Sequence, residues 1–264
     1  MSFETVKYEL NESVAIITMN RPAALNALSL QLSKDLRSAV EKAIEDKVRA
    51  VVLTGEGRAF CSGGDLREMQ ENGKKEDRTE ASLEEPLKAL HDLILLIRDV
   101  PIPFVAAVQG VCAGAGTNLA LACDIVFASE NASFNEAFVR IGLSPDCGGS
   151  FFLPRAVGEK LAAELFMTGG TIDATRAERI GMINRIVSAE NLMEETLQTA
   201  KKLALAPTAA IGRIKQMLNA TFSNDLPQQL ALEQRLQIES GKSNDFKEGV
   251  QAFFEKRQPN FTGT

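Results

Sequence analysis

The sequence predicts an α/β fold with a helical C-terminal region, and two observations support this. Short apolar runs rich in Val, Ile, Ala and Phe alternate with segments of helical periodicity as far as Val187. After that residue only helical patterns follow. Alternating strands and helices are typical of α/β architectures, and a run of helices after them indicates an added layer. We therefore expect a core over residues 1–190 and a helical region over residues 191–264.

Five segments have the composition of β-strands. They are short and rich in β-branched or aromatic residues, and turn-forming residues bound several of them. The first ends at Arg21-Pro22, where proline cannot continue a central strand. The predicted strands are residues 14–20, 49–54, 104–108, 124–128 and 183–187.

Helical segments carry apolar residues at intervals of three and four. Ser29 is a typical N-cap and precedes such a pattern, which begins with Leu32 and Leu36. The long polar stretch over residues 68–85 is the best candidate for a mobile lid or loop. Besides the helix after Ser29, the predicted helices are residues 86–99, 118–123, 191–205, 209–220, 227–239 and 245–256.

Composition excludes several classes of function. The net charge of −6 argues against nucleic acid or a membrane surface as the partner. No apolar run approaches the roughly 18 residues of a spanning helix, and the N-terminus lacks the features of a signal peptide. The four cysteines have no CxxC spacing, so we expect reduced thiols and a cytoplasmic protein. The single histidine, His91, makes a metal site based on histidine improbable.

Two glycine-containing turns carry the clearest chemical signal. They are GRAFCSGGDL over residues 57–66 and GVCAGAGTNL over residues 110–119, and each follows a strand-type run and leads toward a helix. Small residues there let a ligand approach backbone N–H groups, which can stabilise a developing negative oxygen. Neither segment matches the glycine patterns of nucleotide-binding loops. The turns therefore favour an oxyanion site over a phosphate-binding loop.

Together the two turns resemble those of the crotonase superfamily, the enoyl-CoA hydratase/isomerase fold. The resemblance covers nearly the whole chain, from Asn20-Arg21-Pro22 to Asn260-Phe261. It implies a right-handed spiral of repeated ββα units with a C-terminal helical trimerisation region. It also implies an acyl-CoA thioester as the substrate, with coenzyme A as part of that substrate and no separate cofactor or metal. A homotrimer or a dimer of trimers is the implied assembly.

The family motifs also assign residues by position. The resemblance implies that the N–H groups of Gly64 and Ala115 form the oxyanion hole. Lys256 matches a lysine that reaches the coenzyme A of a neighbouring subunit, although a solvated helix face is an equal alternative. The implied coenzyme A contacts within the chain are Leu25, Arg58, Ser62, Gly63, Asp65 and Leu66.

Asp146 is the candidate acid/base. From the residues alone it is also a good helix N-cap. The segment Pro145-Asp146-Cys147 with the two glycines after it resembles the 1,2-epoxyphenylacetyl-CoA isomerases of phenylacetate degradation, and so does the C-terminal run from residue 248 to residue 263. In those enzymes the aspartate is the catalytic acid/base, which implies the same role for Asp146.

Enoyl-CoA hydratases use two glutamates that this chain lacks. The matching positions hold Asn118 and Phe138. Hydration needs one group to activate water and another to manage the α-proton, so efficient hydration is not expected. Glu136 lies two residues from the second position, and on an extended segment it could share that face. It stays a candidate acid.

Three functions remain open. The leading hypothesis is an isomerase that acts on a ring epoxide of phenylacetyl-CoA or on a straight-chain 3-enoyl-CoA. The second is an enoyl-CoA hydratase of fatty-acid β-oxidation, which predicts that Glu136 matters. The third is a non-catalytic acyl-CoA-binding subunit, which predicts binding without turnover. Because a pure binder has no need to stabilise an enolate, the two glycine turns argue against the third.

Overall fold

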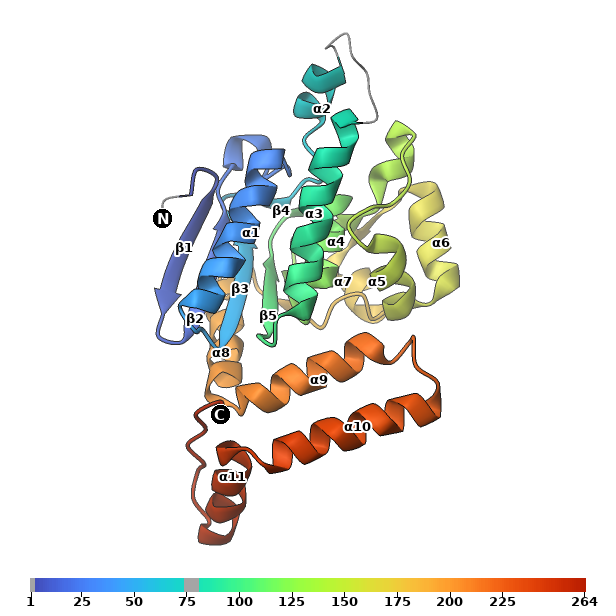
Figure 1. Cartoon of the computed structure of the whole chain (residues 1–264). Coiled ribbons are helices and arrows are strands. Elements are labelled where there is room, and N and C mark those ends of the chain that lie inside the picture. Colours follow the sequence, from blue (N-terminus) through green and yellow to red (C-terminus); the bar gives the residue numbers. More distant parts are fainter. Residues whose placement is uncertain (1–2, 74–80) are drawn as a thin grey trace.

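The computed structural model describes residues 3–73 and 81–264 and has the mixed α/β architecture that the sequence predicts (Figure 1). Its larger sheet has the strand order β1-β2-β3-β5-β7-β10. β1 pairs with β2 in antiparallel fashion, and every other pair in this sheet is parallel. The strands are β1 (Val6–Asn11), β2 (Val14–Met19), β3 (Ala50–Gly55), β5 (Phe104–Val108), β7 (Ile125–Ser129) and β10 (Arg185–Val187).

A second, smaller sheet has the order β4-β6-β8-β9. Its first three strands are parallel, and β9 closes it in antiparallel fashion. All four strands have three residues, which is why the sequence pattern did not reveal them. They are β4 (Ala59–Cys61), β6 (Val111–Ala113), β8 (Ser133–Asn135) and β9 (Thr171–Asp173).

The chain alternates between the two sheets. β3, β5 and β7 are neighbours in the large sheet, and each is followed directly by β4, β6 or β8, which are neighbours in the small one. After β4 and β6 a helical segment leads back to the large sheet, whereas after β8 helices lead first to β9 of the small sheet and then, through α7, to β10 of the large one. A pair of strands followed by a helical segment thus occurs three times in succession, so the chain forms the spiral of ββα units that the resemblance implied.

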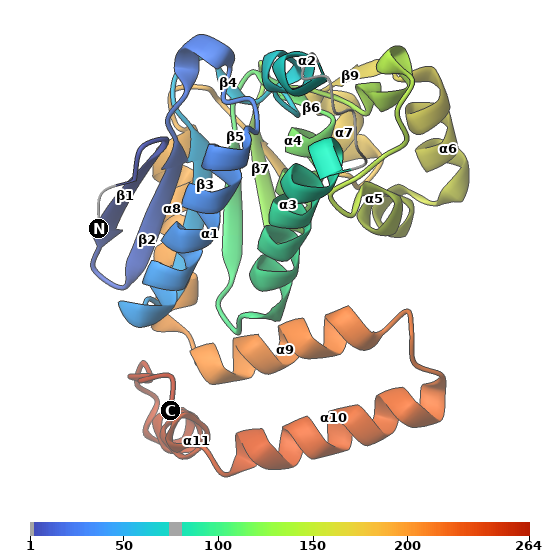
Figure 2. The same cartoon turned by 45° about the horizontal axis from the view of Figure 1, so that its top comes forward.

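Helices cover both faces of the large sheet. Figures 1 and 2 show α1 and α3 side by side on one face, with α8 on the other. Alternate residues of β3 divide between two hydrophobic clusters: Val51 and Leu53 join the cluster with α1 and α3, and Val52 joins the cluster with α8. The helices of the core are α1 (Leu30–Glu45), α2 (Leu66–Gly73), α3 (Ala81–Asp99), α4 (Ala115–Ala122), α5 (Gly149–Val157), α6 (Glu159–Thr168), α7 (Ala174–Arg179) and α8 (Leu192–Leu205), with short 3-10 helices η1 (Pro22–Ala24) and η2 (Ala137–Ile141).

The loop predicted over residues 68–85 is wrong at both ends. The Asp65 side chain accepts hydrogen bonds from the amides of Arg67 (3.1 Å) and Glu68 (3.3 Å), which starts α2 at Leu66, and the helix then continues to Gly73 within the predicted loop. α3 likewise begins at Ala81, five residues before the predicted start at Pro86. The middle of the predicted loop, residues 74–80, lies outside the described residues.

The C-terminal helices form a tail below the core in Figure 1. They are α9 (Thr208–Ala220), α10 (Leu226–Gly241) and α11 (Asn244–Glu255). α8 buries Leu192 and Ala200 against the large sheet, so α8 packs as part of the core. The helices outside the core therefore start at α9. The domain boundary at residue 190 stays a prediction. Among the described residues, no helix is long and apolar enough to span a bilayer.

Candidate active site

The first glycine turn connects β4 to α2 and runs beside the chain after η1. The amide of Leu28 donates to the carbonyl oxygen of Gly63 (2.8 Å), and the amide of Asp65 donates to the carbonyl oxygen of Leu28 (3.1 Å). This pairing uses the residues on both sides of Gly64 and does not use the N–H group of Gly64. The turn therefore leaves that amide available to a ligand.

The second turn connects β6 to α4. Gly114 is the N-cap of α4 with φ +50°, a conformation that favours glycine. Ala115 is the first residue of the helix, so its N–H group has no intrahelical acceptor. The N-terminal end of α4 also carries a partial positive charge that favours an anion.

The two turns lie against each other. A Cβ atom on Gly63 would come within 2.9 Å of the carbonyl oxygen of Ala113 and 3.8 Å of the amide nitrogen of Ala115. A Cβ atom on Gly116 would meet the carbonyl oxygen of Cys61 at 2.5 Å. Glycine at both positions is therefore what allows the two backbones, and their two amides, to approach.

One cavity of about 430 Å³ joins the three residues that the sequence assigned to catalysis. Gly64, Ala115 and Asp146 all line it. Its remaining wall is mostly apolar and is formed by α2, α3 and the segment before α5. The large apolar residues there are Leu28, Met69, Leu87, Leu90 and Leu143. This combination suits an acyl group whose carbonyl oxygen is held by two amides.

Asp146 reaches this cavity from the loop before α5. The side-chain amide of Asn118 on α4 donates to the backbone carbonyl oxygen of Asp146 (2.9 Å), so the loop is tied to the same helix that starts at Ala115. The Asp146 Oδ1 atom is buried and has no hydrogen-bond partner among the described residues. α5 has Gly148 as its N-cap and no side-chain cap, so the alternative role of Asp146 as a helix cap is wrong.

The surroundings of Asp146 suit a proton carrier. Burial raises the pKa of its carboxyl group, while the thiol of Cys147 and the charge of His91 act in the opposite direction. A raised pKa brings the carboxyl group closer to neutral pH, where it can both accept and donate a proton.

The two positions that hold glutamates in hydratases are occupied here by Asn118 and Phe138. Asn118 is fully buried, and its amide bonds to protein atoms. Phe138 is also buried, and a Cβ atom on Gly114 would lie 3.6 Å from its ring. Glu136 is buried behind Asn118, and it is not among the residues that line the described cavity.

The cavity wall contains a glutamate and a histidine that were not assigned to the site from the sequence. Glu68 lines the cavity, but its Oε2 atom accepts a hydrogen bond from the amide of Leu30 at the start of α1 (3.0 Å). His91 on α3 lines the same cavity. In the sequence, Glu68 and His91 are notable only because they lie near helix ends and apolar faces. Neither feature identifies a residue as part of a cavity wall.

The implied coenzyme A residues divide into two groups. Leu25 and Ser62 are adjacent, because the Ser62 amide donates to the Leu25 carbonyl oxygen (3.0 Å), and Gly63 and Asp65 continue this segment. Arg58 and Leu66 are exposed. The Asp65 side chain is already engaged in an ion pair with Arg21 (2.8 Å), which sequence reasoning did not identify.

Lys256 does not join this group. It lies at the C-terminal end of α11 in the tail, and it is not among the residues that line the described cavity. Figure 1 shows α11 at the opposite end of the molecule from α2. Within one chain, Lys256 is therefore separate from the other predicted site residues.

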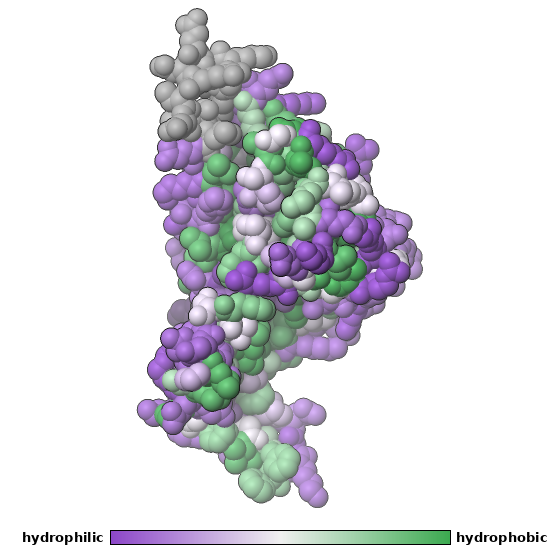
Figure 3. Space-filling model, turned by 90° about the vertical axis from the view of Figure 1, so that its right-hand side faces the viewer, coloured by the Kyte–Doolittle hydropathy of each residue, from purple (hydrophilic) through white to green (hydrophobic). Residues whose placement is uncertain are grey.

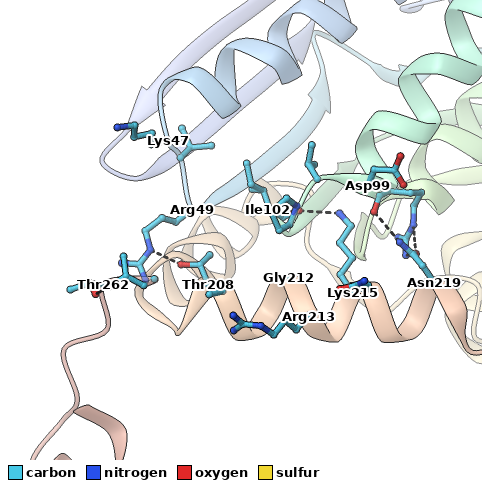
Figure 4. A pocket seen from close by; sticks show the side chains of 18 residues that line it. Lys47, Arg49, Asp99, Ile102, Thr208, Gly212, Arg213, Lys215, Asn219 and Thr262 are labelled. Carbon is cyan, nitrogen blue, oxygen red and sulfur yellow. Dashed lines mark hydrogen bonds between the residues drawn. The ribbon is translucent and has the colours of Figure 1, made fainter. Parts of the chain in front are cut away.

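A larger cavity, of about 1020 Å³, lies elsewhere, between α9 and the core (Figure 4). Two of its basic side chains bind protein atoms: Arg49 donates to Thr208 Oγ1 (2.7 Å), and Lys215 donates to the carbonyl oxygen of Ile102 (3.0 Å). It shares no lining residue with the cavity at Asp146. Its size alone does not make it the site of the chemistry.

Comparison with known proteins agrees with this geometry. The family model described as enoyl-CoA hydratase/isomerase matches residues 9–264. A probable enoyl-CoA hydratase of Rhodobacter capsulatus is 45% identical, over 100% of both chains. The 1,2-epoxyphenylacetyl-CoA isomerase of Escherichia coli is 39% identical, over 98% of this chain and 99% of the relative.

A solved structure shows the same fold. The crystal structure of an enoyl-CoA hydratase from Polaromonas sp. JS666 superposes with a TM-score of 0.92 at 37% identity, covering 97% of this chain and 99% of that one. The relatives carry both hydratase and isomerase names. They therefore establish the family but do not distinguish hydration from isomerisation. The chain belongs to the enoyl-CoA hydratase/isomerase family, the crotonase superfamily, whose members act on acyl-CoA thioesters.

Proposed function

We propose that this chain is an acyl-CoA isomerase in which Asp146 is the acid/base. The observation that carries the proposal is the single cavity lined by Asp146 and by the two turn residues Gly64 and Ala115. The Asp146 Oδ1 atom has no partner among the described residues, whereas the carboxylate of Glu68 is bound to the start of α1. Of these two acids, Asp146 is therefore the one available to a substrate.

The reaction on a 3-enoyl-CoA follows from these groups. The Asp146 carboxylate removes a proton from the α-carbon, and the electrons move to the thioester oxygen to form a dienolate. The N–H groups of Gly64 and Ala115 stabilise that oxygen. The protonated Asp146 then returns the proton to the γ-carbon, so the double bond moves into conjugation and no atom is gained or lost. The same enolate chemistry can assist rearrangement of a ring epoxide on a phenylacetyl thioester.

A hydratase is the second candidate. It is favoured by the name of the 45% identical relative. Against it stand Asn118 and Phe138, since neither side chain can activate water. A hydratase would need Glu136 to take over a role that its position behind Asn118 does not favour.

The coenzyme A part of the substrate is proposed to lie along the segment of Leu25 and Ser62 to Leu66, with Arg58 near the phosphates. Lys256 is proposed to contribute from a neighbouring copy of the chain, because within one chain it lies in the tail, away from the cavity. No metal or separate cofactor enters the proposed reaction.

The test is a comparison of three substrates with the same preparation of enzyme. A straight-chain 3-enoyl-CoA, the ring epoxide of phenylacetyl-CoA, and crotonyl-CoA in water would each be followed by ultraviolet absorbance. We expect turnover of at least one of the first two and little hydration of crotonyl-CoA. Rapid hydration together with no isomerisation would contradict the isomerase and support the hydratase.

A further inference from the structure

Glu136 is a buried acid that the proposed reaction does not use. It follows β8 directly, is 1% exposed, and is the N-cap residue of η2. Its Oε2 atom accepts a hydrogen bond from the side-chain amide of Asn118 (3.4 Å). Its Oε1 atom is buried and has no partner among the described residues. Burying a carboxyl group in this way is costly, so the position calls for a physical explanation.

Asn118 links Glu136 to the loop of Asp146. The same amide nitrogen that bonds to Glu136 also donates to the Asp146 carbonyl oxygen at 2.9 Å. The carboxamide of Asn118 lies directly against the start of α5, because a Cβ atom on Gly149 would overlap three of its atoms. Asn118 is therefore held between Glu136 and the segment that carries Asp146.

This cluster is short of hydrogen-bond donors. The Asn118 amide nitrogen donates to both neighbours, while Asn118 Oδ1, Glu136 Oε1 and Asp146 Oδ1 are all buried without a donor among the described residues. A proton on Glu136 supplies one donor to the cluster. It also removes a buried negative charge next to a second carboxyl group.

The surroundings of Glu136 favour that proton. Burial raises the pKa of its carboxyl group to about 8, the hydrogen bond from Asn118 opposes this, and the charge of Asp146 adds to it. The thiols of Cys112 and Cys147 also face it, and burial raises the pKa of each well above its ordinary value. α6 packs on η2, and its charged residues Glu159, Lys160 and Glu164 are all exposed. Asp173 of β9, the strand that pairs with β8, is also exposed.

We infer that Glu136 is a positioning residue: as a neutral carboxylic acid it holds the amide of Asn118, which in turn fixes the backbone at Asp146. Glu136 does not line the cavity, so it acts through Asn118 rather than on the substrate. The inference rests on the proposed role of Asp146. Under this inference, Glu136 positions the loop of Asp146 and is not a second catalytic acid.

The inference predicts a particular pH profile. Above the pKa of Glu136, near pH 8, the carboxyl group loses its proton, the cluster loses a donor, and a second negative charge stands behind Asp146. The turnover number for isomerisation should then fall with pH. A glutamine at this position keeps an N–H donor and never ionises, so Glu136→Gln should keep its activity near pH 7 within about 3-fold and should not show the decline above pH 8.

The experiment follows the isomerisation of a 3-enoyl-CoA between pH 6 and pH 10 and determines both kcat and KM at each pH. The variants are Glu136→Gln, Glu136→Ala and Asp146→Asn, with Glu159→Gln on exposed α6 as the matched control. We expect Glu136→Ala to lower kcat by about 10- to 100-fold, because misplacement of a catalytic group has effects of that size, with little change in KM. Glu159→Gln should match the wild type at every pH.

Two outcomes would overturn the inference. If Glu136→Gln is as inactive as Asp146→Asn, Glu136 is itself a proton carrier. If Glu136→Gln keeps the decline above pH 8, Glu136 is not the group that titrates. If Glu136→Ala does not fold, as judged by circular dichroism, the pH profile of Glu136→Gln decides alone. Full turnover by Asp146→Asn would contradict the proposed function instead, whatever the Glu136 variants do.

Discussion

At the scale of single residues, the proposed chemistry depends on two backbone amides whose availability comes from local structure. Gly64 lies between two residues that bond to Leu28, and Ala115 is the first residue of α4. Neither amide needs a functional side chain, because the N–H group is the functional part. The glycines around them let the turns approach, so the proposed site could stabilise an anion with few polar side chains.

Ala115→Pro tests this directly. Proline is well tolerated at the first position of a helix, and it replaces the N–H hydrogen by a ring methylene group. We expect kcat to fall by about 100- to 1000-fold, the usual effect of losing one oxyanion donor, with a small change in melting temperature. Glu159→Pro makes the same change at the first position of α6, outside the cavity, and should keep its activity. Equal activity of the two variants would mean that the Ala115 amide is not a donor.

The sequence was informative about these residues to different degrees. The two turns and Asp146 stood in recognisable motifs, and the structure brings all three to one cavity. Glu68 and His91 had no motif, because their place in the cavity wall depends on how α2 and α3 pack against the segment before α5. The burial of Glu136 was equally hidden, since it depends on contacts with α4.

At the scale of elements, one buried lysine connects the tail to the core. Lys215 on α9 is 4% exposed. Its ammonium group donates to the carbonyl oxygens of Ile97 (2.7 Å) and Ile102 (3.0 Å) and to the carboxylate of Asp124 (2.9 Å). Arg98 on α3 bonds to the same carboxylate (3.0 Å). The network therefore joins α9 to α3 and to the chain segments next to β5 and β7.

Lys215→Met should lower stability markedly. The substitution leaves two buried carbonyl oxygens without their donor and removes one partner of Asp124, so we expect a loss of about 3 kcal/mol in the free energy of unfolding. Lys201→Met on α8 is the control, because Lys201 pairs with Glu12 in an exposed position (3.4 Å) and should contribute less than about 1 kcal/mol. Urea denaturation measures both. An equal loss of unfolding free energy in both variants would show that the buried network contributes no more stability than the exposed ion pair.

How well each helix or strand could be predicted depended on its length and on how regular its apolar pattern is. The long helices and five of the six strands of the large sheet follow from their patterns. β1 was not predicted, and neither were β4, β6, β8 and β9, which have three residues each. α2 was missed because a mostly polar stretch gave no apolar face, and because its start depends on the Asp65 cap.

At the scale of the whole molecule, the tail exposes apolar residues. Figure 3 shows apolar patches in green on the tail below the core. Phe253 and Phe254 on α11 are each 78% exposed, and Phe253 lines an apolar groove of about 450 Å³ between α9 and α11. An exposed apolar surface of this kind marks an interaction site. We propose that other copies of the chain cover it, in a homotrimer or a dimer of trimers.

Replacing both Phe253 and Phe254 by glutamate should disrupt that assembly. Light scattering should give at least three times the chain mass of 28.6 kDa for the wild type and a value near 28.6 kDa for the double variant. Leu10→Glu changes an exposed apolar residue on the edge strand β1 and should keep the assembly. A double variant with the wild-type mass would show that this surface is not the interface.

The central claim is that Asp146, and no other acid of the cavity, carries the proton. The most direct measurement compares 3-enoyl-CoA isomerisation by Asp146→Asn and by Glu68→Gln, since both side chains line the same cavity. We expect Asp146→Asn to lose about 100-fold or more in kcat, as removal of an acid/base does, and Glu68→Gln to lose less than about 10-fold. Retained turnover in Asp146→Asn, or an equal loss in both variants, would contradict the account.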